Sequence, residues 1–214
     1  NDISHPNIVD IVDFGETHID GVHVKYIIME FLDGESLSAR IRSAGVSIRE
    51  TLYIIAQCGS ALAASHRKGV VHRDLKPENV LIDKSGRVVV LDFGVARKEG
   101  TPRETMTGLV QGTPRYMAPE QQQGRAVSPA TDVFALGLVI EELFGDRPPP
   151  GVRAILRRAT ERDPQRRYPD AAALGKDLAH PLARRGVMLV GAASALALTG
   201  ALLLTAPGLL GGFV

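Results

Sequence analysis

Two short polar runs, joined by a hairpin sequence, constrain the fold of this chain more than any other feature. Residues 72–79 read HRDLKPEN, and residues 92–94 read DFG. Between them, the apolar runs 80–82 and 88–91 flank the turn sequence DKSG, which predicts a pair of antiparallel strands. Such a hairpin folds back on itself, so its two ends lie close together. We therefore expect a fold in which the two polar runs share one site.

The polar side chains of these runs suit the transfer of a phosphoryl group from ATP. In that reaction the protein mainly positions the reactants and neutralises phosphate charge. Asp74 can supply a carboxylate beside the attacking hydroxyl, and Lys76 can supply a cation near the moving phosphoryl group. Asn79 and Asp92 carry the hard oxygen ligands that Mg²⁺ prefers. The residue types and their order indicate one Mg²⁺-dependent site.

A third motif follows, because residues 112–120 read GTPRYMAPE. The order and spacing of the three motifs resemble the eukaryotic-type (Hanks-type) serine/threonine protein kinase family, in its bacterial receptor-like branch. The resemblance implies an enzyme that phosphorylates Ser or Thr of protein substrates and uses ATP with Mg²⁺, or with Mn²⁺ in its place. Asp74 would be the catalytic base, Lys76 would stabilise the transition state, and Asn79 would complete the catalytic loop. Thr113 would bond around Asp74, which favours Ser or Thr over Tyr as the acceptor.

The same resemblance places the nucleotide on residues 26–32, which read YIIMEFL. Met29 would be the gatekeeper, and Glu30 and Leu32 would offer backbone groups to the adenine edge. Leu81 would pack beneath the adenine ring. The remaining implied ATP-binding residues belong to the two polar runs: Lys76, Glu78, Asn79 and Asp92, of which Asn79 and Asp92 bind the metal.

Other residues are implied to support or regulate the site. Asp132 would anchor the backbone of the catalytic loop, and Glu120 would form a buried ion pair with Arg167. Thr105 and Thr107 resemble the paired threonines that kinases of this branch autophosphorylate, which implies a homodimer that reacts in trans. Arg73 would grip such a phosphate, because a guanidinium can bind phosphate oxygens in pairs.

The expected fold class is α+β, a protein-kinase-like fold that consists mainly of the helical large lobe with a hinge and short antiparallel strands, followed by one transmembrane helix. Hydrophobic spacing and turn signals predict strands at 8–14, 24–31, 80–82 and 88–91, and helices from Ser47 to Gly69 and at 129–144, 152–161 and 170–179. The expected domains are a small-lobe remnant with the end of helix C, strands 4 and 5 and the hinge (1–32), the large lobe (33–180), a juxtamembrane linker (181–186), a transmembrane helix (187–206) and an extracytoplasmic tail (207–214).

The C-terminal end of the chain carries no charged residue after Arg185. Residues 187–206 are uncharged, and as a helix they would span about 30 Å, the thickness of a bilayer's hydrocarbon core. Arg184 and Arg185 precede this segment, which by the positive-inside rule predicts a cytoplasmic kinase domain on a single-pass cell-membrane protein, with the lipid bilayer as a partner. The alternative is a buried helix of a soluble domain, but Ser194 and Thr199 provide too little of a polar face for one.

Composition excludes other classes of protein. Lys plus Arg number 25 against 24 for Asp plus Glu, which argues against a nucleic-acid partner. The single cysteine, Cys58, excludes an internal disulfide framework, and we expect it to pack in the core. The chain begins at Asn1 without a charged leader, so we expect a fragment without a signal peptide.

Two departures from the family pattern bear on activity. The Gly-rich loop, the third-strand Lys and the helix C Glu would precede His5, where only four residues stand, so we expect the chain alone to be inactive. The stretch from Gly137 to Asp163 is also short for the family. The alternatives are a membrane-tethered pseudokinase scaffold and a small-molecule phosphotransferase. Asp74, Asn79 and Asp92 argue against the first, and the complete segment from DFG to APE argues against the second.

Overall fold

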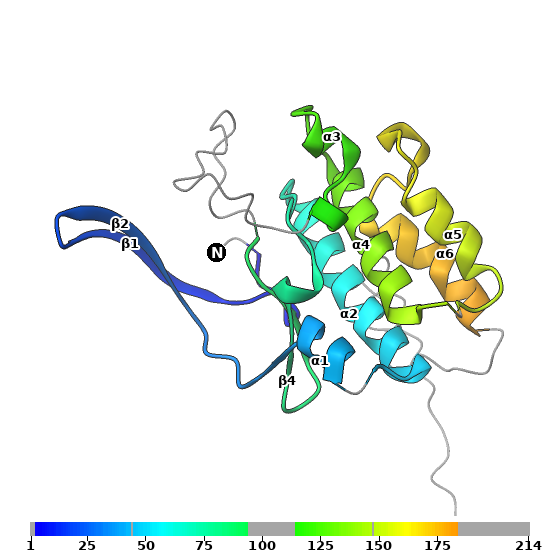
Figure 1. The fold of residues 1–214 in the computed structure, drawn as a ribbon, viewed down its shortest axis with the longest axis horizontal. Helices are drawn as coiled ribbons and strands as arrows, with labels where there is room; N and C mark the ends of the chain where they lie inside the picture. Colours follow the sequence, from blue (N-terminus) through cyan, green and yellow to red (C-terminus); the bar gives the residue numbers. More distant parts are fainter. Residues whose placement is uncertain (1–2, 44, 94–113, 147, 184–214) are drawn as a thin grey trace, which may run out of the picture.

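The computed structural model describes residues 3–43, 45–93, 114–146 and 148–183, and Figure 1 shows their arrangement. A bundle of helices packs against short strands, and one hairpin projects from it. The elements, in chain order, are β1 (Ile11–Ile19), β2 (Val22–Met29), β3 (Gly34–Ser36), α1 (Leu37–Ser43), α2 (Ile48–Arg67), β4 (Val80–Asp83), β5 (Val88–Val90), α3 (Pro119–Gln122), α4 (Pro129–Phe144), α5 (Val152–Ala159) and α6 (Ala171–Ala183), with 3₁₀ turns at Pro77–Asn79, Pro114–Tyr116 and Pro164–Arg166.

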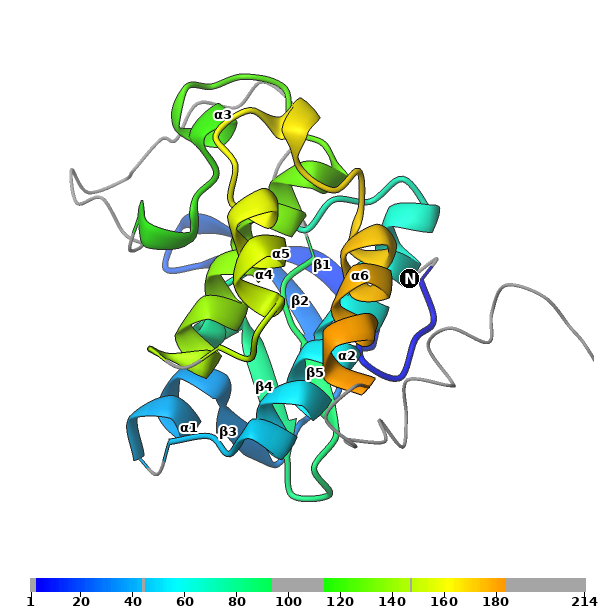
Figure 2. The same ribbon diagram turned by 90° about the vertical axis from the view of Figure 1, so that its right-hand side faces the viewer.

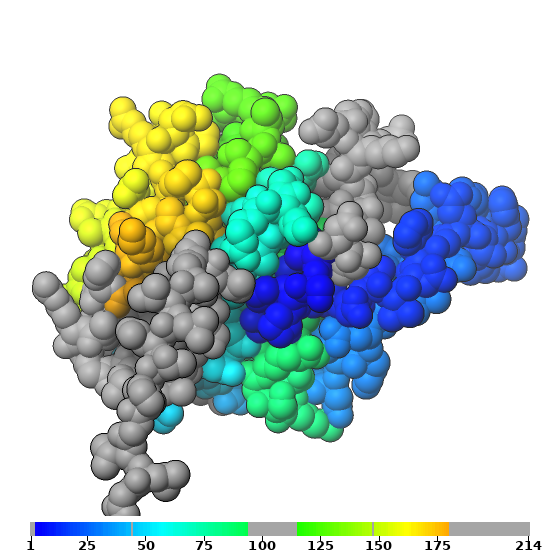
Figure 3. Space-filling view, turned by 180° about the vertical axis from the view of Figure 1, so that it is seen from behind, coloured from blue at the N-terminus to red at the C-terminus, as the bar shows by residue number. Residues whose placement is uncertain are grey.

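The projecting hairpin consists of β1 and β2, which pair antiparallel. Both correspond to predicted strands, 8–14 and 24–31, but they extend farther toward the turn than predicted, to Ile19 and from Val22. Asp20 and Gly21 both adopt positive φ, 52° and 80°, and this two-residue turn closes the ladder directly. Large apolar side chains along the hairpin are exposed, among them Phe14 and Met29. The hairpin stands clear of the helical body when the molecule is seen from behind (Figure 3).

The long helix α2 is the centre of the helical body. Ser47 accepts a hydrogen bond from the Glu50 amide and caps the helix, so its predicted start at Ser47 is confirmed. At the other end Gly69 adopts a φ of +73°, which suits a residue without a Cβ. Figure 2 shows α6 alongside α2, with α4 and α5 beside them. The core between these helices is formed by fully or almost fully buried residues that include Leu52, Leu62, Leu136, Ile140 and Leu174.

Helix α4 matches its predicted bounds, and α5 follows after only seven residues, 145–151. The predicted short connection is therefore present in the fold. Gly137 lets the two helices approach closely, because a Cβ on it would lie 3.0 Å from the Cβ of Ala159. The cysteine prediction is also confirmed: Cys58 is 1% exposed, and burial raises the pKa of its thiol to about 12.

A second sheet has the strand order β3–β4–β5, all antiparallel. The hairpin β4–β5 was expected, whereas β3 and α1 were not, because the sequence GES has no apolar alternation and α1 is only seven residues long. Ile8 does not belong to β1 but forms an isolated parallel bridge with Val90 of β5. The predicted strand 8–14 is therefore wrong at its start. Strands β4 and β5 of this sheet connect the polar run 72–79 to the DFG sequence.

Several predictions concern residues outside the described ranges. These are the membrane helix 187–206, its flanking Arg184 and Arg185, and the activation-segment threonines Thr105, Thr107 and Thr113. Within the described ranges, no helix combines the length and the apolar character needed to cross a bilayer.

Candidate active site

The loop after α2 is held by one buried carboxylate, that of Asp132 in the first turn of α4. Asp132 Oδ2 accepts a hydrogen bond from the His72 amide at 2.8 Å, and Oδ1 accepts one from the Arg73 amide at 2.9 Å. His66 Nε2, at the end of α2, lies 2.8 Å from Oδ2. The expected anchoring of the catalytic loop by Asp132 is therefore present, with His66 as an additional contact that sequence reasoning did not find.

These bonds hold an unusual backbone conformation. Arg73 has a φ of +71°, in the left-handed region that L residues with a side chain rarely adopt. Such a conformation costs on the order of 1–3 kcal/mol and persists only where the surroundings enforce it. Here Asp132 enforces the conformation, because its carboxylate accepts hydrogen bonds from two successive amides of the loop. The turn at Arg73 exposes the next residue, Asp74, to solvent.

Three predicted catalytic side chains meet just after this turn. Lys76 Nζ lies 2.8 Å from Asp74 Oδ2. Asn79, at the end of the 3₁₀ turn, donates from Nδ2 to the Asp74 carbonyl oxygen at 2.8 Å and lies 3.3 Å from Asp74 Oδ2. The structure thus brings Asp74, Lys76 and Asn79 into one hydrogen-bonded group. Thr113, the fourth predicted member, lies outside the described ranges.

Asp92 lies next to this group because the strands fold back as expected. The Leu91 amide donates to the Asn79 carbonyl oxygen at 2.9 Å, one residue before Asp92. Asp92 itself is exposed and has a φ of +56°. His72 joins the two segments: its Nε2 bonds to the Leu91 carbonyl oxygen at 2.7 Å, and its Nδ1 accepts from the Asp74 amide at 3.3 Å. This role of His72 was not predicted, although its place at the start of the HRD sequence was the available signal.

The oxygen donors fit magnesium. Since Asn79 Nδ2 is occupied by Asp74, the amide oxygen Oδ1 remains available as a ligand, and it makes no hydrogen bond to any described residue. The exposed Asp92 carboxylate is equally available. No group of three or more His, Cys, Asp or Glu in the described part of the chain could hold a metal on its own. Two protein oxygens completed by phosphate and water oxygens are the usual arrangement for Mg²⁺, and the same donors suit Mn²⁺.

The predicted adenine residues lie where β2 leads toward β3. Met29 is exposed at the end of β2, and Leu32 is half-buried. Glu30 fixes this segment, because its amide donates to Asp10 O at 3.0 Å and its carboxylate accepts from Arg87 at 3.0 Å. The carbonyl of Glu30 makes no hydrogen bond to a described residue, as an adenine contact requires.

The two remaining predicted nucleotide residues lie on or beside β4. Leu81 of β4 is half-buried and pairs with Ser36 of β3. The carboxylate of Glu78, however, accepts a hydrogen bond from Ser38 of α1 at 3.0 Å. The side chain of Glu78 is therefore committed to α1, which leaves its backbone for a nucleotide.

The predicted ion pair between Glu120 of α3 and Arg167 forms two N–H···O bonds of 2.7 Å each, and both side chains are buried. Thr131 also donates to Glu120, at 2.9 Å. Burial would raise the pKa of the Glu120 carboxyl, but the hydrogen bonds from Arg167 and Thr131 outweigh it and hold that pKa below its ordinary value. The pair joins α3 to the loop that precedes α6.

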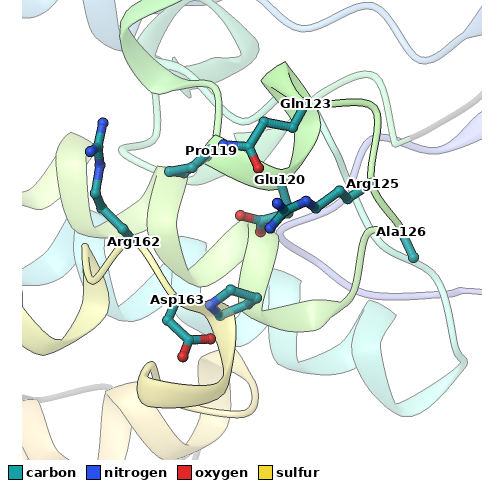
Figure 4. Close-up of a pocket in the computed structure, with 8 residues that line it drawn as sticks. Pro119, Glu120, Gln123, Arg125, Ala126, Arg162 and Asp163 are labelled. Atoms are coloured by element: carbon teal, nitrogen blue, oxygen red, sulfur yellow. The ribbon is translucent and has the colours of Figure 1, made fainter.

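A surface pocket of about 500 Å³ lies over this ion pair, between α3 and the loop at 162–164 (Figure 4). Arg125 and Arg162 stand on opposite sides of it. None of the predicted catalytic or nucleotide-binding residues lines the pocket, so it is separate from the site around Asp74.

Comparisons with known proteins agree with this geometry. The model of the protein kinase domain family matches residues 1–170. Serine/threonine-protein kinase PknA of Mycobacterium tuberculosis is 41% identical over 156 residues, which cover 72% of this chain and 36% of PknA. PknB of Mycolicibacterium smegmatis is 33% identical over 208 residues, with 82% of this chain and 33% of PknB covered. The chain thus spans about a third of the length of these relatives.

A solved structure with the same arrangement is that of the Mycobacterium tuberculosis PknI kinase domain. It matches this chain with a TM-score of 0.64 and 27% sequence identity. The match covers 84% of this chain and 73% of the PknI chain.

We predict that the substitution Arg167→Met lowers the free energy of unfolding by about 3–5 kcal/mol, because it leaves the buried Glu120 carboxylate without its partner. The adjacent, exposed Arg166 is the control, and Arg166→Met should change that free energy by less than about 0.5 kcal/mol. Urea unfolding of the full chain in mild detergent measures both. Equal effects of the two substitutions would contradict the structural role of the pair.

The same pair predicts a dependence on pH. The folded state lowers the pKa of Glu120 from its ordinary value of 4.5. The pair's contribution to the free energy of unfolding is therefore present above pH 4.5, and it is lost as the pH falls through the lowered pKa. Glu120→Gln should therefore make the free energy of unfolding, measured with urea at a series of acidic pH values, depend less on pH than it does in the unchanged chain.

Proposed function

The chain belongs to the protein kinase family, in its bacterial serine/threonine branch, and from that premise we propose that it transfers the γ-phosphoryl group of ATP to Ser or Thr hydroxyls of protein substrates. One observation carries this proposal: Lys76 and Asn79 both bond to Asp74, on a loop whose backbone is fixed by Asp132. That arrangement holds a carboxylate, a cation and a metal-ligating amide within reach of one reacting group.

In the proposed reaction, the Asp74 carboxylate accepts the proton of the substrate hydroxyl. The hydroxyl oxygen forms its bond to the γ-phosphorus as the bond to the leaving ADP oxygen breaks. Lys76 orients the Asp74 carboxylate and brings positive charge to the transferring group. Bound Mg²⁺ supplies charge neutralisation on the phosphates, and Asn79 and Asp92 are the residues that would hold it.

The competing reading, a catalytically silent pseudokinase scaffold, has the same fold but no use for these groups. The chain retains Asp74, Asn79 and Asp92, the three residues that the reaction uses, which favours the enzyme. The 214 residues contain no counterpart of the Gly-rich loop and of the Lys that hold the ATP phosphates, so on their own they should bind ATP weakly and transfer little phosphate.

Mutation of the two aspartates in the longest natural protein that contains these residues tests the proposed function. Asp74→Asn should lower kcat by about 10²–10⁴-fold and leave the affinity for Mg²⁺-ATP within about threefold, because the base acts on the hydroxyl. Asp92→Asn should also weaken Mg²⁺-ATP binding, because it removes a metal ligand. Asp13→Asn, on the exposed hairpin, is the control and should leave both quantities unchanged. A parent protein that transfers no phosphate would point to the scaffold reading, and phosphate transfer that survives both Asp74→Asn and Asp92→Asn would show that these two residues do not carry the reaction.

Membrane anchoring is the second part of the proposal. Helix α6 ends at Ala183, and the uncharged segment 187–206 begins after only three further residues. We infer that this segment spans the cell membrane once, with the kinase domain in the cytoplasm, residues 207–214 outside, and Arg184 and Arg185 among the anionic headgroups. Trans-autophosphorylation of Thr105 and Thr107 within a homodimer, with Arg73 gripping the phosphate, completes the proposed signalling role.

Two pairs of leucines test the anchor. Arginines at the centre of a span cost about 2.5–3.5 kcal/mol each, so the double change Leu196→Arg/Leu198→Arg should release the protein into the soluble fraction after carbonate extraction of cell membranes. Leu209→Arg/Leu210→Arg lies beyond the proposed span and should leave the protein in the membrane pellet. Recovery of the unchanged protein in the soluble fraction would refute the anchor.

A further inference from the structure

We propose that Gln121 is a positioning residue for the catalytic loop: its side-chain amide holds the Arg73 carbonyl and thereby orients the peptide that leads into Asp74. The positioning role rests on the proposed kinase function, whereas the contact itself does not. Gln121 is not part of the polar runs or of the APE sequence, and it reaches Arg73 across 48 positions of sequence.

Both ends of the Gln121 amide are in use. Nε2 donates to the Arg73 carbonyl oxygen at 2.6 Å, and Oε1 accepts from the Ala118 amide at 3.1 Å. The second bond caps the first turn of α3 and prevents the amide group from turning over. Since Oε1 is fixed by Ala118, Nε2 is directed at the catalytic loop.

The position that Gln121 contacts is the one that most needs support. Arg73 has a left-handed φ of +71°, and Asp132 holds its amide at 2.9 Å. Gln121 holds its carbonyl, which belongs to the peptide group shared with Asp74. The loop is therefore clamped from two sides, by α4 at the amide of Arg73 and by α3 at its carbonyl. Rotation of that shared peptide would turn the Asp74 amide away from His72 and move the carboxylate relative to Lys76.

Helix α3 is a firm base for this contact. Glu120, the preceding residue, is fixed by its two bonds to the buried Arg167. The hydroxyl of Tyr116, just before α3, donates to Glu142 of α4. Gln121 follows these two anchored residues, so its bond to the Arg73 carbonyl connects the end of the activation segment to the residue before the proposed base.

Two substitutions separate a positioning role from a simple capping role. Gln121→Glu keeps an oxygen that can accept from the Ala118 amide but removes the donor to Arg73 and places a carboxylate oxygen against the Arg73 carbonyl. Gln121→Met removes both bonds. The neighbouring Gln122 provides a matched control, because its Nε2 donates only locally, to the Met117 carbonyl at 3.0 Å, and it is exposed.

The first test is kinetic and uses the longest natural protein that contains the chain, with dephosphorylated casein as the acceptor. Gln121→Glu and Gln121→Met should each lower kcat at least tenfold, with the KM for ATP within twofold and the thermal unfolding midpoint unchanged for Gln121→Glu. Gln122→Glu should retain the parental kcat. If Gln121→Glu retained full kcat while Gln121→Met lost it, Gln121 would be a helix cap and the positioning role would be overturned.

The second test does not depend on activity. Amide hydrogen exchange of the 214-residue chain in detergent micelles reports on peptides that cover residues 72–76. We expect exchange there to be at least tenfold faster in Gln121→Glu than in the unchanged chain and in Gln122→Glu. Unchanged exchange in Gln121→Glu would overturn the contact. A parent protein that transfers no phosphate would overturn the proposed function instead, and faster exchange would still support the contact.

Discussion

The carboxylate of Asp132 is the interaction on which the site depends. A buried carboxylate is unfavourable unless its oxygens are fully hydrogen-bonded, and backbone amides left without a partner cost about 1–3 kcal/mol each. Asp132 meets both needs at once, because it accepts from the amides of His72 and Arg73 and contacts His66. Its place in the first turn of α4 adds the favourable field of the helix N-terminus. The left-handed turn at Arg73, and with it the exposure of Asp74, follows from this arrangement.

Further hydrogen bonds connect this loop to the end of the β4–β5 hairpin. His72 bonds to the Leu91 carbonyl and so ties the loop to the residue before Asp92. Asn79 bonds back to Asp74 and, through its own carbonyl, to the Leu91 amide. Loop and hairpin are thus joined by several short bonds, whereas the exposed β1–β2 hairpin projects from the body (Figure 1). These bonds hold the loop beside the residue that precedes Asp92.

Much of this could be predicted from the sequence, because the signals are local. Ser47 and Gly69 mark the ends of α2, Asp20-Gly21 marks the first turn, and the kinase motifs identify the loop and the fold. The match to the PknI kinase domain confirms that fold. The contacts of His66 with Asp132 and of Gln121 with Arg73 could not be predicted. Their partners are separated by 66 and 48 positions of sequence, and neither His nor Gln is specific to such a role. Strand β3 was missed because three polar residues form a strand only when β4 lies beside them.

We propose that Asp74 and Asn79, on a loop that the fold holds in place, form one metal-dependent site with Asp92, which follows β5. Paramagnetic broadening tests it most directly, because Mn²⁺ suits the same oxygen ligands as Mg²⁺ and broadens the NMR signals of nearby amides. Mn²⁺ would be titrated with ATP into the ¹⁵N-labelled chain in detergent micelles. We expect the amides at 74–79 and 91–93 to broaden first, and Asp92→Asn to abolish this broadening. Broadening that begins elsewhere, or that is unaffected by Asp92→Asn, would contradict it.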